Sequence, residues 1–133
     1  MPNPHHSTGP DTPDAIPAYD DAPTILAEMR WVTDQVAARP SGTGLSREFW
    51  LRKAALLDRI ALRESAECTP ADAAESNAAA AKAAHRLAQY DRERGGGPLG
   101  TTNEPIPPDS PPWHPSFRPY VRQEYAAWLR MTC

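Results

Sequence analysis

The sequence predicts an all-α protein: a small three-helix bundle built on a central antiparallel hairpin, with a fourth C-terminal helix and proline-rich disordered arms. Sixteen prolines occur in 133 residues, yet residues 24–97 contain only Pro40 and Pro70. Proline removes a backbone hydrogen bond from a helix interior and clashes with the preceding turn, so its scarcity marks the folded part. Ten alanines between Ala71 and Ala88 strengthen this prediction, because alanine has the highest helix propensity.

Composition divides the chain into four segments. They are an acidic arm over residues 1–21, a helical core over 22–97, a proline-rich linker over 98–119 and an amphipathic C-terminal helix over 120–133. The arm holds four aspartates and no basic residue, and the linker holds eight prolines. Such compositions bury too little apolar surface to fold alone.

The first helix is predicted to begin near Asp21 and to end before Pro40. One apolar stripe recurs within it at steps of four, three and four, formed by Ile25, Met29, Val32 and Val36. This spacing predicts the helix face that packs on the core. Trp31 lies roughly opposite the stripe, so it either packs on the last helix or is an exposed anchor for a partner.

The second and third helices have clear starting signals. Ser46 and Thr69 are good N-cap residues, and Pro70 suits a first helical position. The short connection between them predicts the antiparallel hairpin. Leu51 and Leu62 fall on nearly the opposite side of the second helix from its main apolar face, which predicts a central helix or a partner contact.

Aromatic residues near the C-terminus provide further candidates for a partner contact. Trp113 lies in the proline-rich linker, and Tyr125 and Trp128 share the apolar face of the last helix. A tethered amphipathic helix can dock on a partner, or it can fold back and cover a thin core. The sequence favours the second interpretation, because the core needs cover.

A basic stripe on the second helix supports an alternative function. Arg52, Arg59 and Arg63 align at steps of seven and four, and such a stripe can contact nucleic-acid phosphates. The competing interpretation pairs these arginines with Glu28 and Asp34 of the first helix.

Enzyme chemistry finds little support in the sequence. The four histidines are not spaced as metal ligands, and Cys68 and Cys133 form no disulfide framework. The glycine run at 95–97 follows a helix and lacks the features of a phosphate-binding loop. We therefore expect no catalytic residue, no metal and no cofactor.

Residues 47–62, together with residues 120–125, resemble small actinobacterial-type helical proteins, some of them associated with mobile elements. The resemblance implies a helical fold. That group has no assigned activity, so no residue role is carried over to this chain.

These observations predict a non-enzymatic protein–protein interaction or adaptor protein that associates with itself or with a protein partner. The alternative is a DNA-associated accessory protein. A net charge of −3 is too weak to steer any one partner. No apolar run is long enough for a membrane span, and no secretory signal is evident, so we expect a cytoplasmic location.

Overall fold

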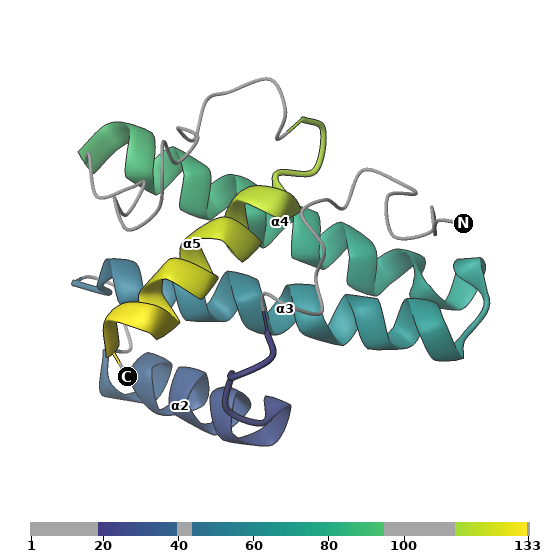
Figure 1. The fold of residues 1–133 in the computed structure, drawn as a ribbon, viewed down its shortest axis with the longest axis horizontal. Coiled ribbons are helices and arrows are strands. Elements are labelled where there is room, and N and C mark those ends of the chain that lie inside the picture. The colour runs from purple at the N-terminus through teal and green to yellow at the C-terminus, as the bar shows by residue number, and fades with distance from the viewer. Residues whose placement is uncertain (1–18, 40–43, 95–113, 133) are drawn as a thin grey trace.

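The computed structural model describes residues 19–39, 44–94 and 114–132, which form four helices and no strand (Figure 1). This confirms the all-α prediction and the fourth helix. The predicted disorder of the arms falls mainly on residues that lie outside the described part, as does Trp113. The helices are α2 (Ile25–Ala38), α3 (Arg47–Glu67), α4 (Pro70–Arg94) and α5 (Arg118–Thr132).

Hydroxyl caps fix where three of these helices begin. The Ser46 hydroxyl accepts from the Phe49 amide at 3.3 Å, and the Thr69 hydroxyl accepts from the Asp72 amide at 3.1 Å, as predicted. The predicted start near Asp21 is wrong by about one turn. Thr24 caps α2 instead, accepting from the amide of Ala27 at 3.1 Å.

Helix α3 is central, since it packs against α2, α4 and α5. The α3–α4 hairpin is the predicted one, and α5 crosses it obliquely in Figure 1. Alanines of both hairpin helices let the backbones approach closely. The main core cluster comprises Leu51, Ala54, Ala55, Ala84, Leu87, Ala88, Phe117, Tyr120, Val121, Tyr125 and Leu129.

Helix α2 is rotated relative to the sequence prediction. Its fully buried residue is Glu28, whereas Met29 and Val36 of the predicted core stripe are 44% and 50% exposed. Trp31 is half-buried rather than solvent-facing. The expectation failed because the partner surface on α3 and α5 offers hydrogen-bond donors to Glu28, and apolar periodicity does not register them.

The segment before α5 is fixed at one unusual residue. Phe117 adopts a left-handed backbone conformation with φ of 61°, which strains a non-glycine residue. Its ring is buried and lies 4.5 Å from the His85 ring, centroid to centroid. His85 Nε2 also lies 2.8 Å from the Pro115 carbonyl oxygen, so α4 holds this segment where α5 begins.

Candidate functional site

Asp58 of α3 is the centre of the contact between α3 and α5. It is fully buried and accepts hydrogen bonds from Arg118 Nε at 2.5 Å and from Arg122 Nε and Nη2 at 2.7 and 2.8 Å. The Tyr19 hydroxyl donates to the same carboxylate at 2.5 Å. One carboxylate therefore joins α3, α5 and the segment before α2.

Asp91 of α4 has the same kind of surroundings. Arg47 donates to it from Nε and Nη2 at 2.6 and 2.7 Å, and the Tyr120 hydroxyl donates at 2.6 Å. Arg47 Nη2 also reaches Glu124 of α5 at 2.8 Å. These bonds tie α3, α4 and α5 together through buried charge.

Glu28 repeats the pattern for α2. Arg52 Nε and Nη2 donate to it at 3.0 and 3.3 Å, and the Tyr125 hydroxyl donates at 3.0 Å. The term buried ion network is used below for the four carboxylates and their arginine and tyrosine partners. Its members are Glu28, Asp58, Asp91, Glu124, Arg47, Arg52, Arg118, Arg122, Tyr19, Tyr120 and Tyr125.

The network shifts the pKa values of its own members. Burial raises the pKa of Tyr19, Tyr120 and Tyr125, and the neighbouring carboxylate raises each further. Burial alone would lower the pKa of Arg47, but its bonds to Asp91 and the charges of Asp91 and Glu124 raise it above the ordinary value. These groups keep their protons and hold the helices together, which is a structural role.

Sequence reasoning missed this network, although a signal was present. Asp58 lies seven residues after Leu51 and three before Ala61, so it occupies a position on the core-facing side of α3. Asp91 likewise lies four residues after Leu87 on α4. An acidic residue at a core position of a helix indicates a buried partner of opposite charge.

Two of the predicted partner-binding residues cannot contact a partner, because Leu51 and Tyr125 are 0% exposed and belong to the core. Leu62 and Trp128 are half-buried. Trp31 and Trp128 flank Arg52, whose guanidinium carbon lies 3.8 and 5.1 Å from their ring centroids. The aromatic residues near α5 therefore close the bundle rather than extend from it.

The predicted basic stripe is also dismantled by these contacts. Arg52 pairs with Glu28 and, at 2.8 Å, with Glu48, so its charge is neutralised within the fold. Arg59 is half-buried, and its guanidinium lies 5.7 Å from the Tyr19 ring centroid. Arg63 alone is well exposed, at 3.7 Å from Glu67. The geometry does not present these arginines together to a phosphate backbone.

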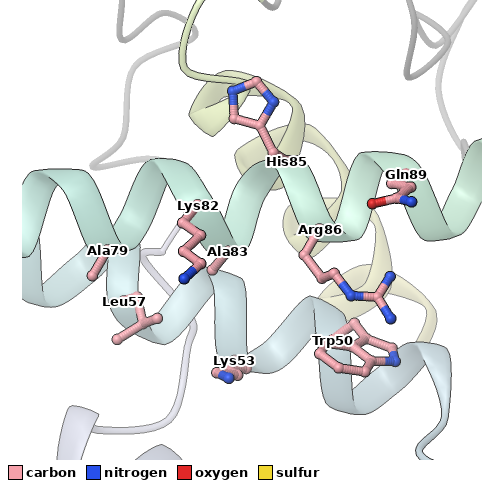
Figure 2. Close-up of a pocket in the computed structure, with 9 residues that line it drawn as sticks. All are labelled: Trp50, Lys53, Leu57, Ala79, Lys82, Ala83, His85, Arg86 and Gln89. Carbon is pink, nitrogen blue, oxygen red and sulfur yellow. The ribbon is translucent and has the colours of Figure 1, made fainter.

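A groove between α3 and α4, on the side turned away from α5, is the largest hollow given for the described part. Its volume is about 560 Å³. Figure 2 shows side chains of both helices converging on it, with α5 behind the hairpin. This α3–α4 groove is lined by Trp50, Lys53, Leu57, Ala79, Lys82, Ala83, His85, Arg86 and Gln89.

Three cations dominate the α3–α4 groove. Lys53, Lys82 and Arg86 line it, and within the described residues none of them lies within ion-pair distance of a carboxylate. Arg86 instead stacks over the Trp50 ring at 4.4 Å. No acidic residue lines the groove. The sequence analysis did not single out these residues, because they are adjacent only after the hairpin forms.

Comparison with protein-family models, curated proteins and solved structures yields no significant match. No group of three or more potential metal ligands occurs among the described residues. In the same part of the chain, no helix has the length and hydropathy that crossing a membrane requires. The α3–α4 groove is therefore the candidate binding site that the geometry supports best.

Proposed function

We propose that this protein is a non-enzymatic adaptor that binds an acidic segment of a partner protein in the α3–α4 groove. The observation that carries the proposal is the trio Lys53, Lys82 and Arg86, which surrounds an open groove without a carboxylate partner in the described chain. By contrast, the arginines of the buried ion network are all paired. Complementary charge from a ligand supplies both attraction and specificity.

The apolar residues of the groove define the partner further. Leu57, Ala79 and Ala83 line it beside Trp50, so they can cover an apolar side chain of the ligand. Protein interfaces combine such apolar centres with a charged rim. We expect the bound segment to carry two or more carboxylates around a leucine or an aromatic residue.

A protein ligand fits these features better than nucleic acid does. A nucleic-acid surface needs a continuous basic track, and Arg52 and Arg59 are engaged inside the fold. The whole chain carries a net charge of −3, which repels a polyanion beyond the groove itself. We expect a cytoplasmic location, where the free, exposed Cys68 stays reduced.

Fluorescence anisotropy with a labelled peptide rich in Glu, Asp and Leu tests the proposal. Binding is expected to weaken with added salt and to disappear when Gln and Asn replace the acids. A single-stranded DNA carrying the same label serves as the rival ligand. Tighter binding of the DNA than of the acidic peptide would replace the proposal with the nucleic-acid alternative.

Charge reversal locates the site. Lys82→Glu and Arg86→Glu are each expected to weaken peptide binding about tenfold while leaving the helical circular dichroism unchanged, since both side chains are exposed. Arg63→Glu is the matched control, because it reverses an exposed charge on α3 outside the groove. Equal losses in all three variants would reject the groove as the site.

A further inference from the structure

Helix α2 leaves its apolar stripe uncovered. Leu26, Met29 and Val36 are 67%, 44% and 50% exposed. Only one other large apolar side chain in the described part, Met131, is exposed to this degree. Exposed apolar residues scattered singly need no explanation, whereas a cluster on one face marks an interaction surface.

The position of α2 leaves this face accessible. Among the described helices, its backbone packs against α3 alone, and Figure 1 places it at the edge of the molecule, across α3 from α4. Glu28 and Trp31 turn towards α3 and α5. The opposite side of α2 therefore points outward.

The outward face has the spacing of a helix-pairing seam. Leu26, Met29, Thr33 and Val36 follow one another at steps of three, four and three, which is the spacing at which two helices pack along their length. All four are exposed. The seam covers two heptads, long enough for a weak to moderate pairing of two copies.

Charges beside the seam identify the partner. Arg30 and Asp34 lie on the same flank of it, both exposed, and no ion pair joins them to each other or to another described residue. In an antiparallel pair related by a two-fold axis, the same flank of each helix meets its own copy. Arg30 then approaches the second copy's Asp34, and Asp34 approaches its Arg30.

We infer that two copies of this chain associate through α2, with the helices antiparallel and a two-fold axis passing beside residues 31–32. In this register Leu26 covers Val36 of the other copy, and Met29 packs beside its Thr33. Both charge pairs form at once, so the surface complements itself. The α3–α4 groove is formed by other helices, so each copy keeps its groove open and the dimer is bivalent.

Light scattering combined with size-exclusion chromatography of the full chain tests the inference. We expect a dimer at micromolar concentration that dissociates on dilution. Met29→Glu should give a monomer with unchanged helical circular dichroism, because Met29 is exposed. Met131→Glu is the matched control, since it places the same charge at the one other exposed large apolar residue, and it should leave the dimer intact.

A charge exchange tests the orientation. Arg30→Asp leaves only acids on the flank and Asp34→Arg leaves only bases, so each alone should weaken association about tenfold. Mixing the two single variants should restore it as a heterodimer, and so should both substitutions in one chain. A wild-type monomer at high micromolar concentration would overturn the inference and assign the stripe to another segment or protein. Failure of the exchanged charges to restore association would overturn the antiparallel register.

Discussion

Asp58 occupies a position on α3 that an apolar residue ordinarily fills. It is fully buried, yet two arginines and the Tyr19 hydroxyl supply every hydrogen bond that its carboxylate needs. Two charges removed from water are tolerated only when geometry and further hydrogen bonds compensate the lost hydration. Asp91 and Glu28 satisfy the same condition, which is why so small a core can contain them.

Removing one of these charges leaves its partners uncompensated. Asp58→Asn keeps the size of the side chain but leaves Arg118 and Arg122 buried beside a neutral group. We expect the free energy of unfolding to fall by about 3–5 kcal/mol, measured by urea denaturation. Tyr19→Phe, which removes a single hydrogen bond, should cost about 1 kcal/mol.

Glu75→Gln provides the control for this series, because Glu75 is an exposed acid on α4 and its loss should change stability by less than about 0.5 kcal/mol. If Asp58→Asn were as mild as Glu75→Gln, Asp58 would not hold the helices together.

The buried tyrosines predict alkaline instability. Burial and a neighbouring carboxylate raise the pKa of Tyr19, Tyr120 and Tyr125 above the ordinary value near 10 in the folded chain. Below pH 10 these tyrosines are protonated in both states, so their contribution to stability is complete. Above pH 10 the unfolded chain ionises first, and stability falls as the pH rises.

Tyrosinate absorbance and circular dichroism, followed together against pH, check this expectation. Ionisation of these three tyrosines should appear only as helical signal is lost. Tyrosinate formation by all tyrosines near pH 10 with the helices intact would contradict the burial of these hydroxyls.

At the scale of helices, α2 is held differently from the others. Its backbone packs against α3 alone, and its buried contacts are the polar bonds of Glu28 and the stacking of Trp31 on Arg52. Helices α3, α4 and α5 instead share the apolar core cluster. Few apolar contacts give a helix a low free energy of local opening.

Hydrogen exchange under dilute, monomeric conditions should therefore separate α2 from the rest. We expect amides of α2 to exchange faster than those in the middle of α4. Glu28→Ala should speed exchange in α2 further and leave α4 nearly unchanged, whereas Glu75→Ala should affect neither. Equal protection of α2 and α4 would mean that all four helices open as one unit.

The helices were predictable from sequence where local chemistry decides them. The hydroxyl caps at Ser46 and Thr69 depend on neighbouring amides, and the α3–α4 hairpin follows from a short connection. The rotation of α2 was not predictable, because it depends on donors that Arg52 and Tyr125 supply from other helices. Apolar periodicity describes which residues avoid water and does not detect a buried acid paired elsewhere in the chain.

At the scale of the molecule, fold and function use charge in two ways. Carboxylates and arginines neutralise one another where α5 crosses the bundle, which fixes the α3–α4 hairpin. On the other side of that hairpin, Lys53, Lys82 and Arg86 line an open groove without internal partners. This groove could not be derived from sequence, since its cations come from helices more than twenty residues apart.

Nuclear magnetic resonance mapping of the acidic peptide on the isotope-labelled chain tests the central claim most directly. We expect the chemical shifts that change to cluster at the Trp50 indole, Lys53, Lys82 and Arg86, and to be absent with the neutralised peptide. Changes confined to α2 or α5, or no change at all, would contradict the proposed role of the groove.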